Sequence, residues 1–248
     1  LVDAFPMANG YPISDSRSGY DKNDPYAGRD PRLTTFIVYN GSKMGVNDAY
    51  IYTGRNGANE DAIGKEKDKS TRTGYYLRKL MRNNVNLDPA TKTTQKHINA
   101  RIRWTEIMLD LAEALNEMGN GDTKVAGSKH SAKSILKGIR ERAGICVGGA
   151  KDPYLEECAS DQAKMRALIH NERRLELCFE NHRFYDLRRW KEELNVQLQG
   201  MDVDMTGGTS VYNVFNIEKT NYSDFMYYGP VPYSEIMKFG NLQQNQGW

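Results

Sequence analysis

At residues 169–191 the chain reads IHNERRLELCFENHRFYDLRRWK. Apolar residues recur there at helical spacing, which predicts a helix over 161–179 and leaves its continuation to Trp190 open. Charged side chains fall inside this apolar stripe rather than opposite it: Glu172, Glu176, Glu180 and Arg183. Burying an unpaired ion costs on the order of several kcal/mol, so these groups require partners of opposite charge.

Arginines on and beside this stretch supply such partners. Arg140 and Arg142 flank the apolar stripe of an earlier helical segment, and more arginines follow within 169–191. We therefore predict a structural ion-pair network between the two helices, in which apolar burial provides the stability and the charges fix the packing register. Its predicted members are Arg140, Arg142, Glu172, Arg173, Glu176, Glu180 and Arg183.

A catalytic interpretation of these carboxylates is the rival hypothesis. Glu172 and Glu176 lie one helical turn apart, with Cβ atoms about 5–6 Å from each other, which is close to the carboxyl separation of a retaining glycosidase. Such a pair must flank a substrate in a cleft. Nearby arginines would also keep both groups ionised and leave no general acid. We therefore predict no catalytic residue and no enzymatic activity.

Two further helices precede this stretch, over 104–118 and 131–143. The face of the first that we expect to be buried comprises Trp104, Ile107, Met108, Leu111, Ala114, Leu115 and Met118. Leu109 and Ala112 lie off this face and would suit an additional neighbour, while Trp190 is expected in the core. The two helices together resemble a tetratricopeptide-type hairpin with a longer loop.

The remainder of the chain carries weaker signals. Residues 1–73 have the Gly, Asn, Asp, Pro and Tyr content of loops and turns. Runs of β-branched and aromatic residues at 33–39 and 75–80 predict two short strands. Residues 195–224 are expected to be irregular, and a short helix is expected near 234–238.

These elements predict a mainly α fold with long loops and a few short strands. We expect a loop- and strand-rich, ligand-facing region over 1–97 and a helical region over 98–248, both belonging to one larger domain. The 39% hydrophobic and 27% charged residues are typical of a globular protein.

Composition also excludes several classes of function. A formal net charge of +2, with no concentrated basic run, gives no reason to expect nucleic acid as a partner. No stretch approaches the roughly 18–20 consecutive apolar residues of a membrane span. Scattered His and Cys residues predict no metal site and no cofactor, and a bridge between Cys146 and Cys158 is left open.

The run at 169–191 is similar to the ER-x-x-E-L-x-x-E-x-x-R-x-x-D-L-x-R-W segment of the SusD/RagB family. Other pieces resemble the family in the same order: NGYPI at 9–13, RDPR at 29–32, TGYYLRKL at 73–80, LDLAEAL at 109–115, RERAG at 140–144 and the terminus VPYSEIMKFGNLQQNQGW. Arg29 and Arg32 of the RDPR piece are expected to brace their loop. Only the terminus departs from the pattern, with Asn241 two or three residues late.

The resemblance implies a SusD-like fold and a glycan receptor. Such a protein captures an oligosaccharide on the extracellular face of the outer membrane and delivers it to a SusC-like TonB-dependent transporter. Family members are about twice this length, so we expect the sequence to be one part of a longer protein. The resemblance also implies a lipid anchor upstream of this chain. We expect that anchor to be the protein's only attachment to the membrane.

Aromatic rings that stack on sugar faces, with amide and charged groups beside them, are the side chains such a site needs. The front loops offer six principal candidates, Tyr50, Tyr52, Arg55, Asn56, Tyr20 and Tyr26, with Tyr11 and Asn59 as further candidates. Two other classes of function remain open. A glycoside-processing enzyme would turn its substrate over, whereas a helical-repeat scaffold would bind a peptide in a concave groove and have no affinity for sugars.

Overall fold

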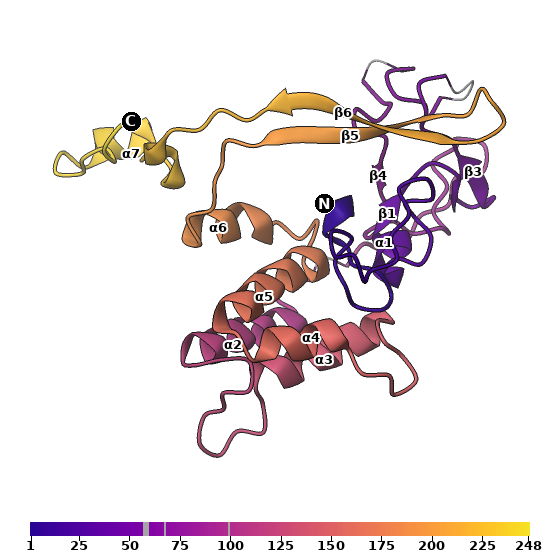
Figure 1. Cartoon of the computed structure of the whole chain (residues 1–248). Helices are drawn as coiled ribbons and strands as arrows, with labels where there is room; N and C mark the ends of the chain where they lie inside the picture. Colours follow the sequence, from indigo (N-terminus) through magenta and orange to yellow (C-terminus); the bar gives the residue numbers. More distant parts are fainter. Residues whose placement is uncertain (57–59, 67, 99) are drawn as a thin grey trace.

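The computed structural model describes residues 1–56, 60–66, 68–98 and 100–248. A block of helices lies beside a loop-rich front region formed by the first part of the chain, and a long β-hairpin extends over both (Figure 1). Helices predominate and the other strands are short, as predicted. No helix in the described ranges has the length and apolar character needed to cross a lipid bilayer.

Five helices make up the block: α2 (Trp104–Glu117), α3 (Ala132–Ala143), α4 (Pro153–Ala159), α5 (Gln162–Glu176) and α6 (His182–Arg189). α2 packs against α3 and α5, and α4 packs against α3 and α5. Local caps set the ends of α3, where Ser131 caps the first turn and Gly144, with φ of 96°, ends the last. The helix predicted over 131–143 is confirmed, whereas its tetratricopeptide-type pairing with α2 stays a prediction.

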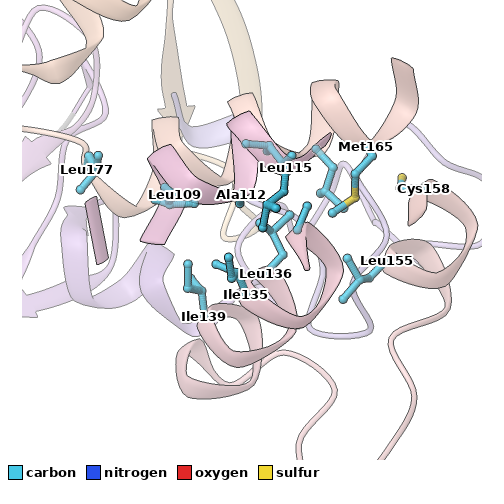
Figure 2. Packing of buried hydrophobic residues seen from close by; sticks show 13 residues of the cluster. Leu109, Ala112, Leu115, Ile135, Leu136, Ile139, Leu155, Cys158, Met165 and Leu177 are labelled. Carbon is cyan, nitrogen blue, oxygen red and sulfur yellow. The ribbon is translucent and has the colours of Figure 1, made fainter. Parts of the chain in front are cut away.

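The core of the block lies between α2, α3, α4 and α5 (Figure 2). It contains Leu109, Ala112, Leu115, Ala132, Ile135, Leu136, Ile139, Leu155, Cys158, Met165, Leu168, Ile169 and Leu177. Each large apolar side chain buried here contributes about 1.5–3 kcal/mol to the free energy of unfolding. Cys146 and Cys158 are both free thiols, so the bridge left open between them is not formed.

The prediction of which face of α2 is buried was largely wrong. Trp104 is 75% exposed, and Ile107 and Met118 are exposed as well, whereas Leu109 and Ala112 are completely buried. The helix carries apolar residues on two faces, and α3 and α5 pack on the face that contains Leu109 and Ala112. Periodicity alone could not distinguish the face that finds these partners from the one that does not.

The helix predicted over 161–179 ends earlier, and the chain then begins a separate helix. α5 stops at Glu176, and the left-handed backbone of Phe179 (φ 65°) and Asn181 (φ 67°) redirects the chain before α6. Trp190 caps the end of α6 and lies half-buried, its ring stacked 3.6 Å from the ring of His170. The Trp190 indole N–H donates to Glu113 at 2.9 Å.

The expectation of irregular structure over 195–224 was wrong. The strands β5 (Gln197–Asp204) and β6 (Val211–Lys219) form a long antiparallel hairpin. Few of their residues are buried, Gly200 and Val203 being exceptions, so the hairpin carries little of the apolar alternation by which strands are recognised. Its backbone ladder and its contact with the front loops hold it in place.

The front region contains α1 (Pro31–Phe36), β1 (Ile37–Val38), β2 (Ser42–Met44), β3 (Ala49–Ile51) and β4 (Tyr76–Leu77), with β1 paired to β4 and β2 to β3. The strand predicted over 33–39 is mostly helix, because Asp30 caps a helical turn that begins with Pro31. Of the strand predicted over 75–80, only β4 forms.

Buried apolar residues join the front region to α5: Val2, Phe5, Tyr26, Leu33, Ile37 and Leu175. Two short 3-10 turns, Val2–Ala4 and Asp224–Tyr227, and the terminal helix α7 (Tyr233–Lys238) complete the fold. The helix predicted near 234–238 is thereby confirmed.

Candidate functional site

A buried cluster of charges joins α5 to the front region. The Glu172 side chain is fully buried and accepts from Arg32 at 2.5 Å, while Arg140 lies 3.5 Å from its other oxygen. Arg32 also reaches Glu176 at 3.1 Å, and Arg140 pairs with Asp152 at 2.6 Å. Each carboxylate is therefore compensated where it enters the core.

The cluster continues toward the end of α5. Arg142 pairs with Glu176 at 2.5 Å. Glu180 accepts from Arg103 at 2.7 Å and from Lys79 at 2.5 Å, and Lys79 also donates to the carbonyl oxygen of Glu176. Cations from the front region, from the segment before α2 and from α3 thus converge on one helix end.

These contacts set the protonation state of the carboxylates. Burial pushes the pKa of Glu172 upward, but the Arg32 and Arg140 guanidiniums outweigh that effect and hold its pKa below the ordinary value. The pKa of Glu180 is likewise lowered, because its bonds to Arg103 and Lys79 outweigh desolvation. Neither group has the raised pKa that a general acid requires.

The network differs in membership from the predicted one. Arg173 belongs to a neighbouring set of pairs, with Asp186 at 2.8 Å and Asp110 at 2.5 Å. Arg183 forms no salt bridge within the part of the chain that the structure describes, so its predicted place in the network was wrong. The prediction missed the cations Arg32, Lys79 and Arg103 and the carboxylates of Asp30 and Asp152, which pair with Arg32 at 2.7 Å and with Arg140 at 2.6 Å.

A pair of exposed aromatic rings lies on the front region. Tyr50 and Tyr52 are 56% and 37% exposed, and their rings are nearly parallel, with centroids 6.2 Å apart and 18° between the planes. Residues two apart on a strand project to the same face, which explains why Tyr50 of β3 and Tyr52 just after it form a pair. The Lys43 ammonium lies 5.0 Å from the centroid of Tyr50.

The β5–β6 hairpin supports the loop that follows this pair. The Arg55 backbone N–H donates to Asp202 at 2.9 Å, and its guanidinium lies 4.4 Å from the ring centroid of Phe215. Asp204 accepts from the backbone N–H and the hydroxyl of Thr206, which lowers its pKa, and the nearby Asn56 side chain contributes in the same direction. Arg55 is therefore held by β5 and β6, with Asn56 beside it, while Asn59 lies outside the described residues.

The remaining candidates are not part of this surface. Tyr26 is 9% exposed and stacks on Tyr39 with centroids 4.1 Å apart, deep in the front core. Tyr11 is equally buried. Tyr20 lies half-buried beneath Arg29, whose guanidinium is 5.4 Å from its ring. We leave these three tyrosines out of the candidate surface, which we define as Tyr50, Tyr52, Arg55 and Asn56.

Over the described residues, no group of three or more His, Cys, Asp or Glu side chains is placed to hold a metal ion. The candidate surface could bind a ligand through its flat aromatic faces and through the guanidinium, ammonium and amide groups beside them. Such a surface suits a polyhydroxylated ligand.

Comparison with known proteins decides the family, because the sequence matches the SusD family over residues 1–248. The chain belongs to the SusD family. A SusD-like protein of Bacteroides fragilis superposes on all of this SusD-family chain, with a TM-score of 0.75 and 29% identity, over 46% of its own length. Among curated proteins, the SusD-like protein P2 of Formosa agariphila is 30% identical over 144 residues, which are 58% of this chain and 24% of that protein.

A second B. fragilis structure, described as a SusD-like carbohydrate binding protein, shares the fold, with a TM-score of 0.65 at 22% identity. The match covers 94% of this SusD-family chain and 45% of that protein. The chain thus spans less than half the length of each of these relatives.

Proposed function

We propose that this protein is a non-catalytic glycan receptor whose ligand stacks on Tyr50 and Tyr52. The observation that carries the proposal is the exposed, nearly parallel ring pair, with centroids 6.2 Å apart. Aromatic rings that stay exposed to solvent favour a ligand with apolar C–H faces and hydroxyl edges, as sugars have. Arg55, held by Asp202, and the neighbouring Asn56 would bond the hydroxyl groups.

The wider role we propose follows the family. The ligand is an oligosaccharide captured on the extracellular face of the outer membrane and handed to a SusC-like TonB-dependent transporter. Membership in the SusD family and the fold shared with a protein described as carbohydrate binding support this role. Attachment to the membrane would come from a lipid anchor outside this chain.

The rival proposal, a glycoside-processing enzyme, has less support. Its candidate carboxylates, Glu172 and Glu176, are buried and bonded to Arg32, Arg140 and Arg142. A glycosidase needs one acid with a raised pKa beside an open cleft, whereas the pKa of Glu172 is lowered by its guanidinium partners against the effect of burial. The same contacts support a purely structural role for these groups.

A glycan array with wild type and Tyr52→Ala tests the proposal. We expect wild type to bind one class of saccharide saturably, with no release of reducing sugar. We expect Tyr52→Ala to bind about tenfold more weakly, because a stacked aromatic contact contributes about 0.5–1.5 kcal/mol beyond the apolar area that it buries.

Tyr233→Ala is the matched control, since Tyr233 is 74% exposed on α7. It should bind like wild type. Binding that is unchanged in Tyr52→Ala would rule out the aromatic pair as the site, and measurable turnover would favour the enzyme.

A further inference from the structure

A groove of about 960 Å³ lies between the β5–β6 hairpin and the α5–α6 segment. The volume falls within the roughly 300–1,000 Å³ of small-molecule sites. One wall carries Arg174 and Arg183, and the hairpin side includes Val214 and Ile217. None of the residues of the Tyr50–Tyr52 surface lines it, so the groove is a separate feature of the molecule.

Arg174 and Arg183, two of the four arginines that line this groove, have no counter-ion among the described residues. Over the described ranges, neither Arg174 nor Arg183 takes part in a salt bridge or a side-chain hydrogen bond, although both are half-buried. Their neighbours on the same two helices, Arg173 and Arg189, are paired with Asp186 at 2.8 and 2.9 Å. Desolvation lowers the pKa of both Arg174 and Arg183, and Arg174 lowers that of Arg183 further.

Three acidic residues line the groove, Asp3, Glu193 and Glu218, and within the described ranges none of them forms a salt bridge with Arg174 or Arg183. Glu193 accepts from the backbone N–H of Asn195. Asp186 is bonded to Arg173 and Arg189, and Glu218 lies 3.3 Å from Arg72. Asp3 and Glu192 act on the two guanidiniums only at a distance, without a salt bridge to either. Two like charges held together in a partly desolvated wall favour an anion from outside the chain.

Aromatic side chains line the groove beside the arginines. Phe179 and Phe184 line it on the helix side and Tyr222 on the hairpin side. The Arg188 guanidinium lies 3.5 Å from the ring centroid of Phe184 and 5.6 Å from that of Tyr222. Phe179 is held in a left-handed backbone conformation, with a φ of 65°, which aromatic residues rarely adopt.

We propose that this groove binds an anionic saccharide, whose carboxylate or sulfate is received by Arg174 and Arg183 while a sugar face packs on the aromatic wall. The inference rests on the proposed glycan-receptor function and narrows its ligand class. A guanidinium group can donate two parallel N–H bonds to a carboxylate or to a sulfate, so the same arginines would receive either group. The ligand class is therefore a glycan with charged units.

Titration calorimetry tests the inference with four probes: trigalacturonate, a sulfated galacto-oligosaccharide, the uncharged galactotriose and inorganic sulfate. Each sugar is titrated into wild type and into the double variant Arg174→Gln/Arg183→Gln. We expect wild type to bind at least one charged sugar more tightly than galactotriose, and the double variant to bind that charged sugar at least about tenfold more weakly than wild type does. The preference should weaken as salt is raised. Arg166→Gln is the matched control and should bind like wild type, because Arg166 does not line the groove and pairs with Glu117.

Thermal unfolding of the same variants separates a ligand site from a structural one. Because the two guanidiniums have no partners to lose, Arg174→Gln/Arg183→Gln should unfold at the wild-type temperature or above it. A marked fall in that temperature would assign the arginines to packing or to a polypeptide segment, and would overturn the inference. Equal affinity for charged and uncharged sugars, binding of free sulfate only, or no binding of a charged sugar would overturn it too. If neutral glycans still bind in a Tyr52-dependent manner, the proposed function survives that failure.

Discussion

Glu172 of α5 connects two distant parts of the chain, α1 and α3. Its carboxylate is fully buried between Arg32 of α1 and Arg140 of α3. Two guanidiniums outweigh the desolvation of one carboxylate here and keep its pKa low, so the charge is retained inside the protein. The pairing favours one mutual arrangement of α1, α3 and α5 over alternatives that would leave these ions unpaired.

Replacing Glu172 by Gln keeps the volume of the side chain and removes its charge. Arg32 and Arg140 would then face each other with too little negative charge between them. We expect the free energy of unfolding to fall by about 3–5 kcal/mol, the usual cost of breaking a buried ion pair by removing one partner. Urea denaturation monitored by circular dichroism measures this change.

Glu141→Gln is the comparison, because Glu141 forms an exposed i,i+4 pair with Lys137 at 3.7 Å. Its removal should cost no more than about 0.5 kcal/mol. Similar losses in the two variants would show that the buried pairs do not specify the packing.

At the scale of elements, the β5–β6 hairpin is held on the front region by close backbone approaches. A Cβ atom added at Gly54 would lie 1.9 Å from the carbonyl oxygen of Val203, and one at Gly74 would lie 2.0 Å from that of Met201. Glycine is required at both positions because no other residue leaves room for the strand. Gly54 follows Tyr52 by two residues, so the fit of the hairpin also positions the proposed ligand surface.

Gly54→Ala should therefore displace β5 from the loop without disturbing the helical block. We expect faster limited proteolysis within the hairpin, and weaker glycan binding if Tyr50 and Tyr52 form the site. Gly207→Ala is the control, since nothing lies within 4 Å of a Cβ at that position. Equal proteolysis rates in the two variants would contradict the importance of this contact.

At the scale of the whole molecule, α2 presents different chemistry on three sides. One side packs in the core, and a row of acidic residues pairs with arginines of α5 and α6, as Glu113 does with Arg189 at 2.5 Å and Glu117 with Arg166 at 2.6 Å. The third side leaves Trp104, Ile107 and Met118 exposed. The relatives are more than twice as long as the segment matched here, and an apolar helix face of this kind is typical of an interaction surface.

We expect the chain, studied alone, to self-associate through this face at high concentration. Trp104→Ser combined with Ile107→Ser should weaken that association about tenfold or more, because each buried apolar side chain contributes about 1.5–3 kcal/mol. Sedimentation velocity over a range of concentrations measures the effect. Tyr233→Ser, which removes an exposed ring elsewhere, should leave association unchanged. A double variant that sediments like wild type would contradict the prediction.

Part of the fold and of the site could be read from local sequence. The apolar period of residues 131–143 predicted α3, and the structure shows that the Ser131 cap and the left-handed Gly144 set its ends through interactions between residues a few positions apart. The same reasoning predicted that the carboxylates of α5 need cationic partners. It could not choose among the arginines: Arg32, 140 residues away in sequence, reaches Glu172, and Arg183 does not.

The amino-acid pattern alone was enough to predict the helices α2, α3 and α5, the need of their carboxylates for cationic partners and the family resemblance. The buried side of α2, the particular cations that pair with the carboxylates and the hairpin at 197–219 became known only from the folded chain, as did the exposure of Tyr50 and Tyr52 and the burial of Tyr26. The difference lies in the distance along the chain over which these interactions act. Helix periodicity and caps act within one or two turns, whereas burial and ion pairing depend on groups brought together from distant parts of the chain.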